Sequence, residues 1–389
     1  MSITAPEGFV AAGLACGIKA SGAPDLALVA STSGPVPAAG VFTANLAAAA
    51  PVQVCRDHLA VTAGRAGAVV LSSGNANAAT GAPGKADALR MCTLVGDGLG
   101  VRAAEVLVCQ TGLIGIPLPM APIETGIPAL VEARAGGRDA GRRAAVAIMT
   151  TDTICKEVTV QGPGFTVGAM AKGAAMLAPN MATMLAVLTT DARCDPADLA
   201  VALRGAVQAT FNQMTVDGCT STNDTVVVMA SGASPAPVTV GALGDALCEA
   251  CGELAAMMAA DAEGATKVAH VIVTGAASDD EAHRAARKVA DSALVKCSLN
   301  GEDPYWGRVV SELGSAGVAF DVDRVEVAYG GVAVCRAGVA APHDEAAVHR
   351  HMQGRAIEVR CDLGLGAGTG AVLTTDLGHG YIDENRTTS

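Results

Sequence analysis

Thr183 lies at a join between two kinds of sequence. The segment KGAAMLAPNMATMLAVLTTDA, residues 172–192, begins as a glycine-containing loop and continues into apolar residues typical of a buried strand. If the bond between Ala182 and Thr183 were cut, Thr183 would carry both a hydroxyl nucleophile and a free α-amine. The unperturbed pKa of such an amine, roughly 7.7–8, suits a general base near neutral pH. The alternative is that Thr183 is simply a β-branched residue that favours a strand.

Other nucleophiles and metal sites have little support in the sequence. No serine lies in a G-x-S-x-G elbow, and none of the seven histidines has a recognisable triad setting. Cys248 and Cys251 form a C-x-x-C pair without a second pair of ligands nearby, so a place in a helix core or on its surface is favoured over zinc. The helical stripe that supports this interpretation is Leu243, Leu247, Cys251, Leu254 and Met258.

Two further motifs are weak as ligand sites. His343, His349 and His351 occur in the polar segment 340–353 without a carboxylate or cysteine partner in an apolar frame. We therefore expect an exposed connection, a solvated loop or helix face, and no metal site. The glycine run GLGAGTG, residues 364–370, does not match G-x-G-x-x-G and precedes no obvious helix, which argues against a dinucleotide site.

Composition favours an enzyme of small molecules. The 389 residues suffice for one large domain or two of ordinary size. Hydrophobic residues make up 51% of the chain but aromatic residues only 2%, so Ala, Val, Leu, Met and Gly must build closely layered sheets and helices. The net charge of −12 argues against binding to nucleic acid or to an anionic membrane.

The N-terminal sequence and the cysteines indicate a cytoplasmic protein. MSITAPEGFVAAG lacks the basic region of a signal peptide, and no run of about 18 strongly apolar residues predicts a membrane span. Twelve cysteines without a framework spacing indicate reduced, mostly buried thiols.

The expected secondary structure is mixed α/β with antiparallel pairing. Helices are expected after the N-cap Asp195 and after Ser278, which forms a capping box with Glu281. A hairpin is expected at 325–334, around Gly330 and Gly331. Further strands are predicted at 67–72, 105–110, 268–274 and 357–363.

The segment around Thr183 resembles the K-G-x-G-M-x-x-P-x-M-A-T-M-L signature of the ornithine acetyltransferase family, also called glutamate N-acetyltransferases. The resemblance covers nearly the whole chain, and ten blocks in the expected order should not arise by chance. The other blocks lie at 8–28, 38–52, 72–81 (SSGNANAATG), 110–115 (QTGLIG), 148–153 (IMTTDT), 217–225 (DGCTSTNDT), 261–267 (DAEGATK), 301–309 and the terminal YIDENRTTS.

This resemblance implies a sandwich of β-sheets covered by helices, similar to N-terminal nucleophile enzymes. It implies self-cleavage between Ala182 and Thr183 into an α chain, residues 1–182, and a β chain, residues 183–389, which stay in one intertwined structure, as α2β2 or a higher assembly. The implied reaction transfers acetyl from N2-acetylornithine to glutamate in arginine biosynthesis. No cofactor is expected, and acetyl-CoA stays open as an alternative donor.

The resemblance also assigns roles to individual residues. Thr183 would be the nucleophile, and Thr111 and Gly112, at the turn after the strand 105–110, would stabilise the oxyanion. Lys172 suits an α-carboxylate, and Glu263 suits the δ-ammonium of ornithine. The positions that match the family's substrate contacts are Thr150, Lys172, Thr183, Glu263, Asn385 and Ser389.

Departures from the family pattern leave specificity open. Ala175 replaces the second glycine of K-G-x-G, Gln110 stands where serine is common, and Tyr305 replaces the asparagine of D-P-N-W-G-R. The ending ENRTTS is one residue shorter than the usual E-N-S-A-Y-[ST]-[ST]. Two alternatives therefore remain: a paralogous acyltransferase of a specialised pathway, and a self-processing amidase or aminopeptidase that uses water as acceptor.

Overall fold

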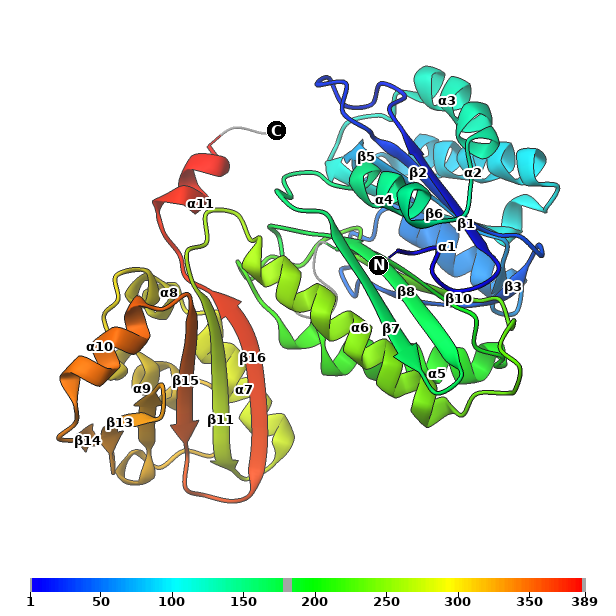
Figure 1. The fold of residues 1–389 in the computed structure, drawn as a ribbon. Helices are drawn as coiled ribbons and strands as arrows, with labels where there is room; N and C mark the ends of the chain where they lie inside the picture. The colour runs from blue at the N-terminus through cyan, green and yellow to red at the C-terminus, as the bar shows by residue number, and fades with distance from the viewer. Residues whose placement is uncertain (1, 178–183, 387–389) are drawn as a thin grey trace. The chain divides into compact units, whose positions relative to one another are not determined.

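The computed structural model describes residues 2–177 and 184–386, and it divides into two units. Unit 1 comprises residues 1–212 and 220–258, and unit 2 comprises residues 213–219 and 259–388, apart from the residues outside the described ranges. Figure 1 shows the strands and helices of each unit. Three of the predicted site residues, Ala182, Thr183 and Ser389, lie outside the described residues.

The first sheet of unit 1 has four strands in the order β1-β2-β5-β6. β2 pairs antiparallel with β1 and β5, whereas β5 and β6 are parallel. Helix α3 packs on β2, and helix α2 packs on β5 and β6. The bounds are β1 Phe9–Leu14, β2 Leu26–Ser31, β5 Ala68–Asn75, β6 Val106–Leu113, α2 Gly81–Leu99 and α3 Met120–Glu132, with the short helix η1 at Ala103–Glu105.

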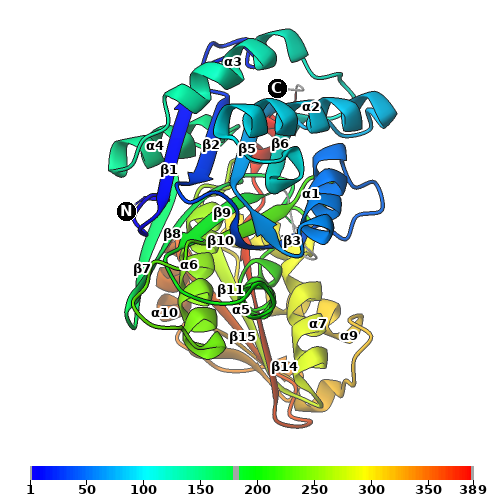
Figure 2. The same ribbon diagram turned by 90° about the vertical axis from the view of Figure 1, so that its right-hand side faces the viewer.

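The second sheet of unit 1 has six strands in the order β4-β3-β10-β9-β8-β7. β9 and β10 are parallel, and the other pairs are antiparallel. Helices α5 and α6 run along this sheet in Figures 1 and 2. The bounds are β3 Val36–Phe42, β4 Arg65–Ala66, β7 Lys156–Gly162, β8 Phe165–Lys172, β9 Leu185–Thr190, β10 Thr225–Ala230, α1 Ala50–Val61, α4 Arg138–Ala147, α5 Pro196–Ala209, η2 Phe211–Gln213 and α6 Val240–Ala260.

The two sheets of unit 1 share one hydrophobic core. Leu28 and Val70 of the four-stranded sheet belong to the same buried cluster as Met170, Val187 and Val227 of the six-stranded sheet. Small side chains throughout this cluster let the layers approach closely. The expected mixed α/β sandwich of sheets with helices against it is therefore confirmed.

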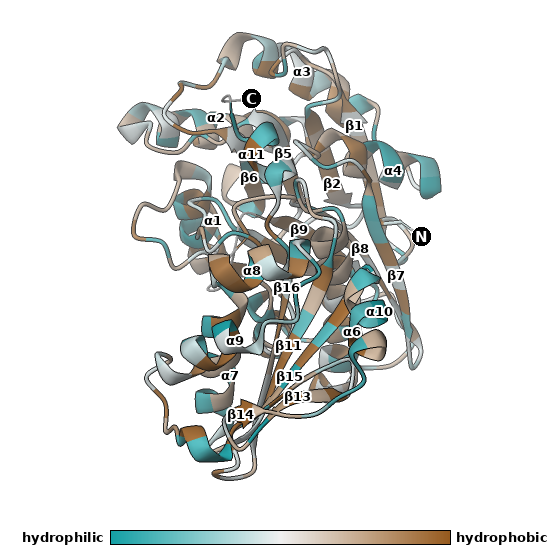
Figure 3. Cartoon of the chain, turned by 90° about the vertical axis from the view of Figure 1, so that its left-hand side faces the viewer, coloured by the Kyte–Doolittle hydropathy of each residue, from teal (hydrophilic) through white to brown (hydrophobic). Residues whose placement is uncertain are grey.

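Unit 2 is built on a single six-stranded sheet in the order β14-β13-β12-β15-β11-β16. β11 and β15 are parallel. Buried residues alternate with more exposed ones along most of both strands, and in β15 the hydrophobic residues alternate with hydrophilic ones (Figure 3). This alternation is typical of a sheet with one buried face. The bounds are β11 Val268–Ala276, β12 Glu326–Tyr329, β13 Val332–Arg336, β14 Val339–Ala340, β15 Ala356–Asp362, β16 Gly368–Thr375, α7 Asp279–Ala290, α8 Ala293–Asn300, α9 Trp306–Gly314, η3 Val322–Arg324, α10 Glu345–Gln353 and α11 His379–Glu384.

Two glycines of the GLGAGTG run bring strand β16 and helix α7 into close contact. A Cβ atom at Gly370 would lie 2.5 Å from the backbone nitrogen of His283, and one at Gly368 would overlap the backbone of Ser278. Real Cβ atoms essentially never approach so closely. The run is therefore explained by helix–strand packing.

Most predicted elements are present, with local differences. The hairpin turns at Gly330 and Gly331, both with positive φ. Ser278 caps α7 by accepting from the Glu281 nitrogen, but the Glu281 carboxylate accepts from Ala319 and completes no capping box. Asp195 precedes Pro196 at the start of α5 without a capping bond from its side chain.

The polar segment 340–353 is largely exposed, as expected. Most of it forms helix α10, because the Asp344 side chain accepts from the Ala347 nitrogen and caps it. His351 is only partly exposed, and its Nε2 accepts from the Glu358 nitrogen at 2.9 Å.

Helix α6 carries the predicted apolar stripe. Leu247, Cys251 and Met258 are fully buried on it, and Cys248 is partly exposed. Within residues 2–177 and 184–386, none of the helices combines the length and the apolar character that crossing a membrane requires.

We predict that Gly370→Ala destabilises unit 2 by about 1–3 kcal/mol, because the added methyl group must displace the backbone of α7. Gly301→Ala is the matched control, since its Cβ would lie 3.4 Å from its nearest neighbour and its φ is −78°. Thermal unfolding of both variants tests this. Equal melting temperatures for the two variants would contradict the packing argument.

Candidate active site

The residue after Thr183 is fixed on both sides of its backbone. Met184 donates its N–H to Oδ1 of Asp224 at 3.0 Å, and its carbonyl accepts from the Thr225 nitrogen at 3.1 Å. The Met184 nitrogen belongs to the peptide bond that follows Thr183. Asp224 therefore holds the chain one residue beyond the predicted nucleophile.

Thr111 and Gly112 lie within the last residues of β6. The predicted strand 105–110 continues to Leu113, so the expected turn after Gln110 is wrong. The pairing of β6 with β5 becomes irregular at Gly74 and Asn75, opposite Thr111 and Gly112. Gly112 has φ of +128°, and a Cβ there would lie 2.5 Å from the Asn75 nitrogen, so only glycine fits. Such irregular pairing often occurs next to active sites.

Asn223 holds this part of β6 from the other sheet. Its Nδ2 donates to the carbonyl of Gln110 at 2.9 Å and to the carbonyl of Ala76 at 2.6 Å. Asp224 is the next residue and binds the Met184 nitrogen. One dipeptide thus links the strand that carries Thr111 to the amide that follows Thr183.

The unusual Gln110 is part of a buried polar network. Its Nε2 donates to the Ser72 hydroxyl at 3.2 Å, and its Oε1 accepts from Nδ2 of Asn77 at 2.8 Å. Asn77 also donates to the carbonyl of Gly84 in α2. Because these partners satisfy the buried amide, glutamine is accommodated next to Thr111.

Lys172 points to Thr111. Its side chain is 3% exposed, and Nζ donates to Oγ1 of Thr111 at 3.4 Å. Asp152 lies beside it, accepting from the Gly173 nitrogen at 2.7 Å and from Nζ of Lys156 at 2.6 Å. Burial alone would raise the pKa of Asp152, but the charges of Lys172 and Lys156 outweigh it and hold the pKa at about 2. The carboxylate is ionised and fixes the end of β8.

Thr150 reaches the same cluster through Asp152. Its nitrogen donates to Oδ2 of Asp152 at 3.0 Å. Lys19, from the block at 8–28, donates through Nζ to the carbonyl of Met149 at 2.7 Å. Unit 1 therefore brings together Thr111, Lys172 and Thr150 from three segments of the chain.

Unit 2 brings together Glu263 and Asn385. Nδ2 of Asn385 donates to Oε2 of Glu263 at 2.7 Å, although 122 residues separate them. Gly264 has φ of +63°, and a Cβ there would overlap the backbone of Tyr381 in α11. The Tyr381 hydroxyl donates to Oδ2 of Asp217 at 3.2 Å.

Sequence reasoning missed three residues that organise unit 1. Asp152 lies in the block IMTTDT, and Asn223 and Asp224 lie in DGCTSTNDT. Both blocks support the family resemblance, but their polar residues also fit ordinary turns. The one signal in the sequence was that Asn223 and Asp224 stand immediately before the strand TVVVMA, where polar side chains can bind the ends of neighbouring strands.

Tyr305 contacts its own helix. It precedes α9 as the N-cap residue, its side chain is 55% exposed, and its ring lies 5.9 Å from the guanidinium carbon of Arg308. Nothing else in unit 2 explains the exchange of asparagine for tyrosine.

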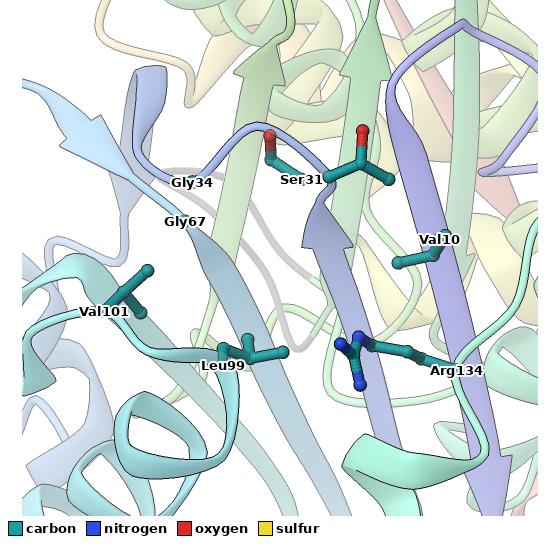
Figure 4. A pocket seen from close by; sticks show the side chains of 8 residues that line it. Val10, Ser31, Gly34, Gly67, Leu99, Val101 and Arg134 are labelled. Carbon is teal, nitrogen blue, oxygen red and sulfur yellow. The ribbon is translucent and has the colours of Figure 1, made fainter.

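A cavity of about 450 Å³ lies elsewhere in unit 1 (Figure 4). Its wall is polar and apolar in nearly equal measure, and the Arg134 guanidinium is part of the polar lining. None of the described site residues contributes to it. The lining residues are Val10, Ser31, Thr32, Gly34, Gly67, Leu99, Val101 and Arg134.

Comparisons with known proteins agree with the sequence blocks. The model of the ArgJ family matches residues 10–387. The arginine biosynthesis bifunctional protein ArgJ of Mycolicibacterium paratuberculosis is 50% identical, over 98% of this chain and 95% of its own. The protein of the same name from Thermobifida fusca is 47% identical, over 99% of each chain.

A solved structure of ornithine acetyltransferase from Mycobacterium tuberculosis, complexed with ornithine, aligns at 45% identity and a TM-score of 0.42, over 46% of this chain and 94% of its own. The family match and the two relatives each extend over nearly the whole sequence. On these grounds the chain belongs to the ArgJ family.

Proposed function

We propose that this protein is an acyltransferase of arginine biosynthesis that moves the acetyl group of N2-acetylornithine to glutamate. The products are ornithine and N-acetylglutamate. The names of its relatives support the pathway. The observation that carries the mechanism is the link through Asn223 and Asp224, which joins the strand of Thr111 to the amide after Thr183.

The reaction begins with self-cleavage between Ala182 and Thr183. This step frees the α-amine of Thr183, which then serves as the general base for its own hydroxyl. Residues 1–182 and 183–389 become the α and β chains. The β8–β9 and β3–β10 pairs cross this division, so hydrogen bonds of one sheet hold the two chains together.

Acetyl transfer follows in two halves. Thr183 attacks the acetyl carbonyl, its amine takes the hydroxyl proton, and ornithine leaves with a proton. Glutamate then attacks the resulting acetyl-threonine ester, which restores the hydroxyl. Thr111 and Gly112 stabilise the oxyanion of both tetrahedral intermediates, a contribution typically worth about 10²- to 10³-fold in rate for one donor.

Lys172 and Glu263 carry charges opposite to those of the substrate's α-carboxylate and δ-ammonium. Lys172, with Thr150 nearby through Asp152, binds the α-carboxylate that acetylornithine and glutamate share. Glu263, with Asn385 as its partner, binds the δ-ammonium of ornithine. Ser389 completes the contacts that the family pattern implies.

Several expectations extend this proposal. The enzyme needs no cofactor and assembles as α2β2 or higher in the cytoplasm, and acetyl-CoA stays open as an alternative acetyl donor. In the described part of the chain, no group of three His, Cys, Asp or Glu side chains is placed to hold a metal ion.

The direct test of function is an assay with N2-acetylornithine, with and without glutamate. The proposal predicts N-acetylglutamate in amounts equal to the ornithine released, and little steady-state release without glutamate. Glutamate-independent hydrolysis at the full rate would instead favour an amidase.

Self-cleavage should be visible on denaturing electrophoresis. We expect two chains from the wild-type protein and one inactive chain of 389 residues from Thr183→Ala, since the variant lacks the attacking hydroxyl. Mass spectrometry should find threonine at the new N-terminus. An active wild-type protein with an intact Ala182–Thr183 bond would refute the free-amine mechanism.

Lys172→Ala should raise KM for N2-acetylornithine about 10- to 100-fold, because a charged hydrogen bond contributes roughly 1.5–3 kcal/mol. Self-cleavage should persist at least in part. Lys85→Ala is the control, since Lys85 pairs with Asp57 and is 42% exposed. Steady-state kinetics measures both variants, and an unchanged KM in Lys172→Ala would remove Lys172 from the binding site.

A further inference from the structure

Asp224 has one carboxyl oxygen without a partner. Oδ1 accepts from the Met184 nitrogen, whereas Oδ2 is buried and has no hydrogen-bond partner among the described residues. The side chain is fully buried. A buried polar atom that stays unpaired destabilises the folded state, so its presence here calls for a functional explanation.

The surroundings favour the protonated acid. Burial raises the pKa of Asp224 well above its usual value, and the hydrogen bond from the Met184 nitrogen, the nearby Ser221 hydroxyl and the charge of Lys172 oppose this effect only in part. Among the described residues, Lys172 is the charged residue that interacts electrostatically with Asp224. In its neutral form Asp224 carries a hydroxyl, so one oxygen accepts while the other donates.

Substrate chemistry supplies an acceptor for this donor. In N2-acetylornithine and in N-acetylglutamate, the α-carboxylate is attached to the carbon that bears the reacting acetamide. This carboxylate must therefore lie within a few bonds of the group that the nucleophile attacks. Asp224 accepts a hydrogen bond from the amide directly after Thr183, and it interacts electrostatically with the charge of Lys172.

We propose that Asp224, as a carboxylic acid, donates a hydrogen bond from Oδ2 to the α-carboxylate of both substrates, alongside Lys172. This inference rests on the proposed function. Binding then gives the buried hydroxyl its missing partner, and the substrate carboxylate meets one cation and one neutral donor. The same group that anchors the chain beyond Thr183 also orients the substrate.

Two substitutions separate this role from packing. Asparagine has the shape of the neutral acid, with an oxygen for the Met184 nitrogen and an amide N–H where Oδ2 carries its proton. Leucine has a similar volume but provides neither group. An ionised Asp224 could not donate from Oδ2 and would repel the α-carboxylate, so neither substitution would then weaken ornithine binding.

The experiment is calorimetric titration of ornithine into the purified, self-cleaved protein, in which ornithine binds without turnover. We expect Asp224→Asn to keep the wild-type Kd within about threefold and Asp224→Leu to raise it about 10- to 100-fold. Asp191→Asn is the matched control at the other end of β9, where the carboxylate accepts from the Thr166 nitrogen. It should bind like wild type.

Equal losses in the asparagine and leucine variants, or no loss in the leucine variant, would overturn the proposal. If Asp224→Leu fails to fold, as judged by its thermal unfolding, Asp224→Ala takes its place because it also lacks the donor. Absent cleavage or absent acetyl transfer in the wild-type protein would refute the proposed function. Ornithine affinities in an active, cleaved protein test Asp224 alone.

Discussion

The structure of unit 1 depends on the hydrogen bonds of Asn223 and Asp224. These neighbours immediately precede β10, and their side chains reach in two directions, to the backbone of Gln110 and to that of Met184. Each bond contributes only about 1 kcal/mol net, but a buried carbonyl or amide left without its partner would cost more. The dipeptide therefore fixes Thr111 relative to the strand that follows Thr183.

The sheets make this link possible. β10 lies between β3 and β9, so hydrogen bonds on both sides hold the start of β10. The many alanines in the core keep the two sheets of unit 1 close, which brings the end of β6 within reach of Asn223. Bulky aromatic side chains at these positions would push the two sheets apart. The close packing of small side chains is how a chain with only 2% aromatic residues forms a large core.

Much of the fold could be predicted from local sequence. The period of apolar residues identified α6, and the glycine pair identified the hairpin between β12 and β13. For the segment of α10 the sequence left a solvated loop and a helix face both open, because its polar residues dominate the pattern, although Asp344 offered a capping signal. Family motifs singled out Thr111 and Lys172, and the structure brings these two together. Asn223 and Asp224 could not be found in this way, since Asn223 bonds a carbonyl 113 residues away and local patterns carry no such information.

We infer that Asn223 acts on catalysis through the strand of Thr111. The most direct measurement is a double-mutant cycle on the single-turnover release of ornithine from N2-acetylornithine, using Asn223→Ala, Thr111→Val and the double variant. Asn223→Ala should slow release by about 10²- to 10³-fold, the usual cost of a lost oxyanion donor. In that background Thr111→Val should add little, because Thr111 is already misplaced. Wild-type rates in Asn223→Ala, or rate losses that simply multiply in the double variant, would show that Asn223 does not act through Thr111.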